Sequence, residues 1–230
     1  YLLTKISNYH HRTPHFFEKI EQIIKQYKNI ILNFFSNSEI FDIFKNNKRL
    51  LLFLFEENII ILNKSITNIF LTKKYQKANY LSYFFIETAN FFDSKLTKKF
   101  EWKSNLDTFK EKRKIGENDN YICKLIRNDS IEDFVIYVNK HHISLQSRIQ
   151  PSIFETNLFL NQNKPTLIEY AAFFGSIQIF QFLRLNDVEL APSLWIYAIH
   201  GQCPELIHIL EFSEIQLPNN SCNEIIIESI

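Results

Sequence analysis

The chain has 230 residues, of which 46% are hydrophobic and 22% are charged, and its formal net charge is +1. A chain of this size and composition buries a substantial core, as one large domain or as two small ones. The near-zero charge excludes a global field that would attract nucleic acid or an anionic membrane. We therefore expect no nucleic-acid partner.

The sequence also bears on where the protein works. Cys123, Cys203 and Cys222 are odd in number and far apart, which argues against a disulfide framework and favours a reducing compartment. No apolar run reaches the roughly 18 residues of a membrane span, because Glu56 and Glu57 interrupt the best candidate. We expect a cytoplasmic, intracellular protein without a membrane span. The absence of methionine indicates a fragment of a longer chain.

The clearest helix is predicted near the N-terminal end. Thr13 suits the N-cap, and Pro14 suits the first helical position, where its missing N–H does no harm. Apolar residues then recur at helical spacing, at Phe16, Phe17, Ile20, Ile23, Ile24, Tyr27, Ile30, Ile31 and Phe34. We expect this row of side chains to lie against other helices.

Further helices are predicted over residues 40–44, 50–55, 58–71 and 80–92. The run Leu51–Leu62 is interpreted as a buried helix pair. No stretch shows sustained strand alternation with hairpin turn signals. The N-terminal half is therefore predicted to be mostly helical.

Residues 95–114 carry eight basic and three acidic side chains. One interpretation is a phosphate-binding patch. The other is a solvated helix face that leads into a linker, and we prefer it because runs of charge are usually solvated. The loop-forming sequence GENDN then predicts a boundary between two domains, residues 1–115 and 116–230.

Two segments in the second domain are similar when they are aligned on their glycines, Gly175 and Gly201. In each segment a short apolar helix ends at the glycine, and a second apolar helix begins two to four residues later. This alignment pairs Ala172 with Ala198, a small residue that lets the helices approach closely. A tight turn between antiparallel helices requires positive φ, which glycine adopts without a Cβ clash. Both glycines are therefore predicted to be structural turn residues.

A weaker copy lies upstream at residues 121–138, with Asp129 in the place of the glycine. Aspartate tolerates the left-handed region next best after glycine, together with asparagine. Residues 139–164 would form a long insertion, and residues 221–230 would open a further unit. The second domain is thus predicted to hold about three repeats and a truncated fourth.

These repeats resemble the ankyrin repeat, in which a T-P-L-H-x-A stretch opens a helix pair in a unit of about 33 residues. The sequence TLIEYAA occupies that place, although the glycines are only 26 residues apart (Gly175 to Gly201). Together, IRNDSIEDFVIYV, LIEYAAFFGSIQIF and PSLWIYAIHGQCPELIHILE resemble a large, lineage-expanded family of degenerate ankyrin-repeat proteins of protists. The aligned positions disfavour the alternative, a nonrepetitive helical bundle.

The resemblance implies an all-α fold: a helical N-terminal region of unknown function, followed by an ankyrin-type α-solenoid of helix-turn-helix repeats. It covers residues 120–230 and implies no established activity.

Only one cluster has the residue types of a metal site. Zinc sites use cysteine and histidine at short spacing, as His200, Cys203 and His208 do. A fourth ligand is absent and the spacing fits no known pattern, so we expect no metal and no cofactor. The glycine-rich and nucleophile motifs of common enzymes are also absent. We assign no catalytic residue and do not expect an enzyme.

Two functional hypotheses remain. The first is a noncatalytic protein–protein interaction module or scaffold that binds an unidentified protein through its stacked repeats. Its candidate contact residues are Phe173, Phe174, Ile199 and His200, of which the three apolar ones could instead pack between repeats. The alternative is a structural or regulatory domain whose repeats only stabilise a functional N-terminal half. An exposed apolar patch on the inner helices of the repeats favours the first hypothesis, and one within residues 1–115 favours the second.

Overall fold

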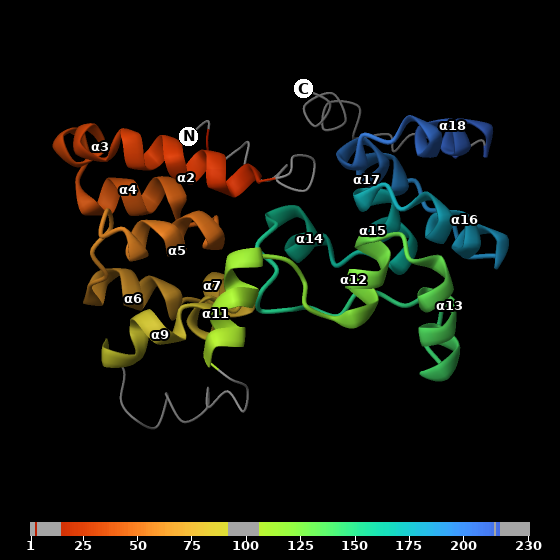
Figure 1. Ribbon diagram of the computed structural model, residues 1–230, viewed down its shortest axis with the longest axis horizontal. Helices are drawn as coiled ribbons and strands as arrows, with labels where there is room; N and C mark the ends of the chain where they lie inside the picture. The colour runs from red at the N-terminus through yellow and green to blue at the C-terminus, as the bar shows by residue number, and fades with distance from the viewer. Residues whose placement is uncertain (1–2, 4–14, 92–105, 214, 217–230) are drawn as a thin grey trace. The chain divides into compact units, whose positions relative to one another are not determined.

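The structure is a computed structural model that describes residues 3, 15–91, 106–213 and 215–216 (Figure 1). Within these residues the chain is all-helical, and its one β-type pairing is an isolated antiparallel bridge between Arg148 and Thr166. In the described residues, no helix is long and apolar enough to cross a lipid bilayer.

The chain divides into two compact units. Unit 1 consists of Tyr1–Asn118 and Ser152–Gln162, and unit 2 consists of Asp119–Pro151 and Asn163–Ile230. The division between the first two segments, after Asn118, falls within the boundary loop GENDN identified in the sequence. Part of the expected insertion, however, returns to unit 1. The chain therefore passes between the units three times.

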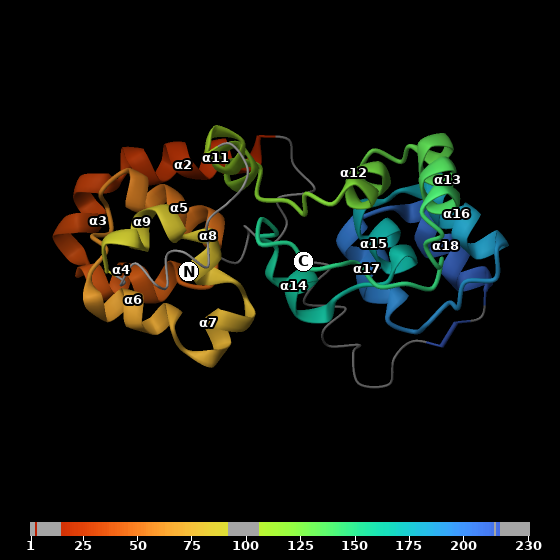
Figure 2. The same ribbon diagram turned by 90° about the horizontal axis from the view of Figure 1, so that it is seen from below.

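Unit 1 consists of short helices around one hydrophobic core (Figures 1 and 2). They are α2 (Phe16–Gln26), α3 (Lys28–Phe34), α4 (Asn37–Phe44), α5 (Lys48–Glu56), α6 (Lys64–Phe70), α7 (Lys73–Lys77), α8 (Tyr80–Tyr83), α9 (Phe85–Thr88), η2 (Ala89–Phe91), α11 (Leu106–Ile115) and α14 (Leu158–Asn163). α5 is central: it packs on α2 and α4 and is buried from Lys48 to Leu54. The predicted N-terminal helix is present as α2 and α3, whereas its predicted caps Thr13 and Pro14 lie outside the described residues.

The predicted helix pair over Leu51–Leu62 is wrong. α5 ends at Glu56, and Asn58 takes the left-handed conformation at φ 52°, which breaks the helical hydrogen-bond pattern. Ile59 and Ile60 are buried in the core from a loop instead of a helix. Their apolar character predicted burial correctly, but burial does not fix the backbone conformation.

A buried lysine holds Ser152–Gln162 on unit 1. The ammonium group of Lys48 donates to the carbonyl oxygens of Ile153 and Glu155, at 3.3 and 3.4 Å. It also lies 5.6 and 5.4 Å from the ring centroids of Tyr80 and Tyr83, where cation–π attraction partly replaces lost hydration. Burial nevertheless lowers the pKa of Lys48 to about 8.

Further buried polar groups fix the same segment. The Glu155 carboxylate accepts the backbone N–H of Asn118 at 3.3 Å, and the Thr156 hydroxyl donates to the carbonyl of Gly116 at 2.7 Å. Asn157 then accepts the Leu160 N–H at 3.1 Å and so caps α14. These bonds leave the segment as an integral part of unit 1.

The lowered pKa of Lys48 predicts a pH-dependent stability. Between pH 8 and the ordinary lysine pKa the unfolded chain binds more protons than the folded chain, so stability increases with pH in this window. We expect the free energy of unfolding to rise by about 2 kcal/mol between about pH 7.5 and pH 9.5. Urea denaturation across this range measures the rise, and Lys48→Met should abolish it. An equal rise in the variant would contradict this role. Above this range the raised pKa values of Tyr80 and Tyr83, caused by burial, act in the opposite direction.

Unit 2 is a stack of three helix pairs. The first helices are α12 (Tyr121–Arg127), α15 (Leu167–Phe174) and α17 (Leu194–Gly201), and the second helices are α13 (Ile131–Lys140), α16 (Ile177–Leu185) and α18 (Pro204–Phe212). α15 packs on both α12 and α17, and its residues from Leu167 to Phe173 are all buried. A helix that is almost wholly apolar, with Glu169 as its one charged residue, fits this central place. The predicted truncated fourth repeat lies outside the described residues.

The last two pairs repeat at a spacing of 27 residues, both from Leu167 to Leu194 and from Ile177 to Pro204. α15 and α17 have 8 residues each, and α16 and α18 have 9 each. This register pairs Ala171 with Ala198, one residue away from the pairing predicted by aligning the glycines.

The two glycines have different roles, which corrects the prediction for Gly201. Gly175 ends α15 at φ 68°, as expected of a turn residue. Gly201 is the last helical residue of α17, and Gln202 takes the left-handed conformation at φ 48°. A Cβ atom at Gly201 would lie 2.3 Å from the carbonyl oxygen of Ala172. Glycine is therefore needed there for the close approach of α17 to α15.

Asp129 forms the turn between the two helices of the first pair, and its side chain also binds α16 of the second pair. Its backbone has φ 49°, and its carboxylate accepts the N–H groups of Gln178 and Ile179, each at 3.0 Å. Unpaired N–H groups at the start of a helix are stabilised by such an acceptor. The turn of one repeat thus caps the second helix of the next.

Exchanging the residues at two equivalent turns tests this assignment. Gly175→Gln should lower the free energy of unfolding by about 1 kcal/mol, because a side chain is strained at positive φ. Gln202→Gly should raise it by roughly 0.5–1 kcal/mol for the same reason. Urea denaturation measures both changes. Equal, small effects of the same sign would show that these turns are not conformationally equivalent.

Candidate functional site

The structure separates the four predicted contact residues. Phe173 and His200 are buried, and their rings pack 5.1 Å apart between α15 and α17. They hold adjacent repeats together and are not available to a partner, which corrects the prediction for these two. Phe174 and Ile199 are half-buried and keep part of their surface accessible.

Phe174 belongs to a small cluster at the turn end of the first helices. The Arg127 guanidinium donates to the Tyr170 hydroxyl at 2.8 Å and lies 5.9 Å from the centroid of the Phe174 ring. The ring centroids of Tyr170 and Phe174 are 4.7 Å apart. This combination of a cation and an aromatic edge suits contacts with a protein surface.

The three candidate zinc ligands do not come together. His200 is buried, Cys203 is half-buried at the start of α18, and His208 is exposed and lies 3.1 Å from Glu211. Within the described residues no three His, Cys, Asp or Glu side chains form a group suited to a metal ion.

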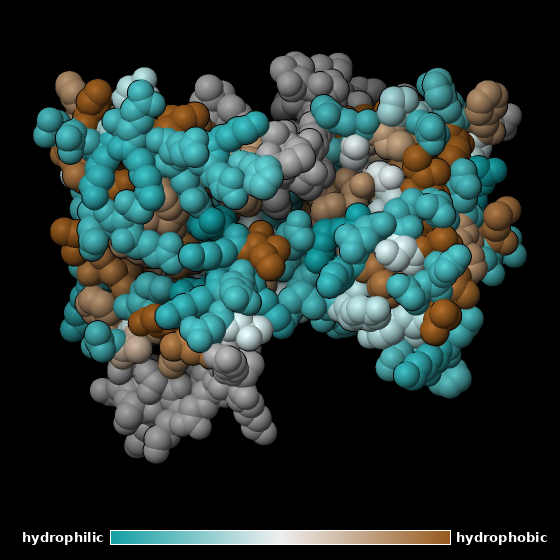
Figure 3. All heavy atoms as spheres, viewed as in Figure 1, coloured by the Kyte–Doolittle hydropathy of each residue, from teal (hydrophilic) through white to brown (hydrophobic). Residues whose placement is uncertain are grey.

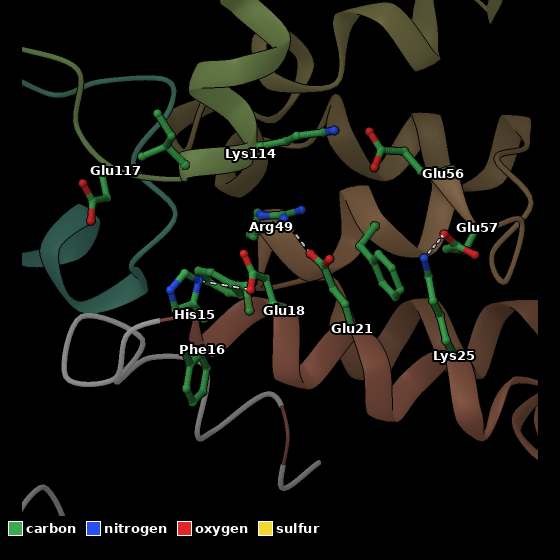
Figure 4. Close-up of a pocket in the computed structure, with 13 residues that line it drawn as sticks. His15, Phe16, Glu18, Glu21, Lys25, Arg49, Glu56, Glu57, Lys114 and Glu117 are labelled. Carbon is green, nitrogen blue, oxygen red and sulfur yellow. Dashed lines mark ion pairs between the residues drawn. The ribbon is translucent and has the colours of Figure 1, made fainter.

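Unit 1 contains a charged groove with a volume of about 750 Å³. α2 forms one side, the end of α11 forms the opposite side, and α5 lies between them (Figure 4). Arg49 and Phe53 are its buried lining residues, and Phe17 beside them is half-buried. The other lining residues are His15, Phe16, Glu18, Glu21, Lys25, Glu56, Glu57, Lys114, Ile115 and Glu117.

Two ion pairs organise the charges of the groove. The guanidinium group of the buried Arg49 lies 2.5 Å from a carboxylate oxygen of Glu21, and its central carbon is 5.5 Å from the centroid of the Phe17 ring. The ammonium group of Lys25 lies 2.8 Å from a carboxylate oxygen of Glu57. Burial raises the pKa of Glu21, and Arg49 opposes this rise. The groove is therefore held together by opposite charges.

The lining has an acidic excess, with five glutamates against three lysine or arginine side chains. Glu56 has no ion-pair partner within the described residues, and its charge further raises the pKa of Glu21. A cationic side chain in the groove would relieve this repulsion. The groove is thus chemically suited to a basic group.

α2 and α3 also carry an exposed apolar stripe. Ile23, Tyr27, Ile30 and Phe34 are 43%, 48%, 53% and 77% exposed, and hereafter they are called the α2–α3 stripe. Hydrophobic side chains reach the surface over these two helices in Figure 3. The prediction that the whole apolar row lies against other helices is therefore wrong. Ile20 and Ile24 enter the core, but this second set does not.

Sequence reasoning did not single out the groove, because its residues come from three segments that only folding brings together. One signal was present: Glu18, Glu21 and Lys25 recur at helical spacing on a face of α2. The matching glutamates and the lysine of the other segments carry no comparable pattern.

Comparison with known proteins assigns no family to this chain: no protein-family model matches it, and neither a curated protein nor a solved structure is similar to it. Its function is therefore argued from geometry.

The buried ion pair of the groove should matter for stability. Glu21→Leu leaves the Arg49 guanidinium buried without its carboxylate, which should lower the free energy of unfolding by about 3 kcal/mol. The double variant Glu21→Leu with Arg49→Met should recover most of the loss, because it removes both charges. The control is Glu18→Leu, an exposed residue one turn earlier, which should change stability by less than about 0.5 kcal/mol. Chemical denaturation of the wild type and these three variants measures the changes. Equal losses of stability in Glu21→Leu and Glu18→Leu would contradict the assignment.

Proposed function

We propose that this protein is a noncatalytic protein–protein interaction module or scaffold, and that its principal binding surface is the α2–α3 stripe. The observation that carries the proposal is the exposure of four large apolar side chains along two consecutive helices, α2 and α3, and the residue that joins them. Contiguous exposed apolar surface is rare on soluble monomers and marks sites of association.

The location of the stripe favours the hypothesis of a functional N-terminal half. All four residues belong to unit 1, whereas Phe173 and His200 of the repeats are buried. On this proposal unit 2 is an ankyrin-type stack. Its support is the 27-residue register, the left-handed turn after each first helix, and the Ser193–Glu169 hydrogen bond of 2.6 Å between successive repeats.

A second candidate surface lies on unit 2. Phe174 and Ile199 are half-buried at the turn end of stacked first helices, where Arg127 adds a cation. Stacked repeats commonly bind partners through such positions. This surface is consistent with the original repeat-based hypothesis.

The proposal involves no catalytic residue, metal or cofactor. It also keeps the protein in the reducing interior of the cell. Among the described cysteines, neither Cys123 nor Cys203 forms a disulfide, which is consistent with a reducing compartment.

Affinity capture from the source cell tests the proposal with point variants of the full chain. Deletion of the second domain is unsuitable, because it would remove Ser152–Gln162 from unit 1. Ile30→Glu places a charge in the stripe and should reduce recovery of the bound protein at least about tenfold, since interface anchors typically contribute 1–2 kcal/mol or more.

The matched control is Leu185→Glu, which changes an 80% exposed leucine of α16 in unit 2 and should leave recovery unchanged. Phe174→Glu tests the second surface in the same way. If the bound protein is lost only with Phe174→Glu, the stripe is not the binding surface and the repeats are.

A further inference from the structure

The charged groove of unit 1 lies along two helix faces. On α5, Arg49, Phe53 and Glu56 are spaced four and three residues apart, so they share one face of the helix. On α2, Glu21 and Lys25 are four residues apart and share a face in the same way. All five residues line the groove, whose volume of about 750 Å³ lies in the range of ligand-binding sites.

The groove holds two of its own cations by the same means. The Lys25 ammonium group, 2.8 Å from the Glu57 carboxylate, also lies 5.5 Å from the centroid of the Phe53 ring. Arg49 is held likewise, by Glu21 and by a phenylalanine ring. An ion pair and a cation–π contact act together on each cation. This lining therefore has the chemistry that binds basic side chains.

Glu56 is a carboxylate of the groove that holds no cation. It is exposed, and it has no ion-pair partner within the described residues. In Figure 4 the Lys114 side chain extends from α11 toward Glu56, but no ion pair joins the two. Burial and the charge of Glu56 both raise the pKa of Glu21. A cation from a ligand, placed beside Glu56, would relieve this repulsion.

Arg49 adds a hydrogen-bond donor to the same lining. The residue is only 7% exposed, and its Nε–H has no acceptor within the described residues. A buried donor without an acceptor is unfavourable, and a slight turn of the guanidinium group would present this one to the groove. A ligand that carries both a cation and a carbonyl oxygen can satisfy Glu56 and Arg49 together. A peptide with a basic side chain has both groups, whereas a simple polyamine has only the cation.

We propose that the groove binds an arginine-containing segment of a partner protein, with the guanidinium group beside Glu56 and a backbone carbonyl oxygen on Arg49. Arginine suits the groove better than lysine, because its planar group can pair with a carboxylate and stack on a ring. Phe16 and Phe17 are half-buried and offer ring surface for such stacking. The groove shares no residue with the α2–α3 stripe, so it is a second binding site and does not depend on the first.

Fluorescence anisotropy with the purified full chain at low ionic strength tests the proposal. The probe is an end-blocked, labelled peptide in which two adjacent arginines are flanked by glycines. This peptide should bind, and the same peptide with glutamine in place of arginine should not. Absence of binding by the arginine peptide, or equal binding by the glutamine peptide, would overturn the proposal.

Variants with opposite expected effects locate the site. Glu56→Gln should weaken binding of the arginine peptide at least about threefold, and Lys114→Gln should strengthen it by about as much, because a competing cation is removed. The matched control is Glu111→Gln, which removes the same charge from an exposed residue of α11 outside the groove and should leave binding unchanged. Circular dichroism must show the same helix content in all the proteins. Equal weakening in Glu111→Gln and Glu56→Gln, or no gain in Lys114→Gln, would exclude the groove as the site.

Competition with spermidine tests whether the ligand is a peptide. Spermidine carries amino groups but no carbonyl oxygen, so it should displace the labelled peptide only at about tenfold higher concentration than the unlabelled peptide does. Displacement at equal concentrations would overturn the peptide as the ligand.

The variant used for the stripe separates the two sites. Ile30→Glu should bind the arginine peptide like the wild type even though it is expected to lose the captured protein. Loss of peptide binding in this variant would place the peptide on the stripe and overturn the groove as its site.

Discussion

No helix in the described part of the chain exceeds the 11 residues of α2. Isolated helices of fewer than about 12–15 residues are marginally stable in water, because nucleation is unfavourable and few hydrogen bonds follow it. Each helix therefore depends on the face that it buries against its neighbours. α15 satisfies this requirement on all sides, whereas α2 satisfies it on one side and carries the groove and the apolar stripe on others.

Much of the fold could be predicted from the sequence, because helical periodicity and turn residues are local signals. The helical class is confirmed, and the left-handed conformations of Gly175 and Asp129 agree with the turns expected there. The role of Gly201 could not be predicted, because it depends on a carbonyl group of another helix. For the same reason the burial of Phe173 and His200 could not be predicted, because neighbouring helix pairs cover both side chains. The groove depends wholly on packing between distant segments.

Unit 1 repeatedly pairs buried cations with aromatic rings. Lys48 lies over two tyrosines, Arg49 over a phenylalanine, and Arg113 over the rings of Tyr83 and Phe109. Arg113 also makes hydrogen bonds of 3.0 and 2.8 Å to the Glu87 carboxylate. With 15% aromatic residues, the chain has ring faces that can partly replace water around a charge. Part of its basic character is thereby structural, and Arg113 of the predicted basic run is one example.

The return of Ser152–Gln162 to unit 1 has a consequence for inheritance. In many proteins a domain is one continuous stretch of chain, and recombination can move it between genes intact. Here a single crossover at Asn118 would leave Lys48 without the carbonyl groups that it binds and would leave the Thr156 hydroxyl in the other product. The two units can therefore vary separately by point substitution, but they must be exchanged, duplicated or lost together.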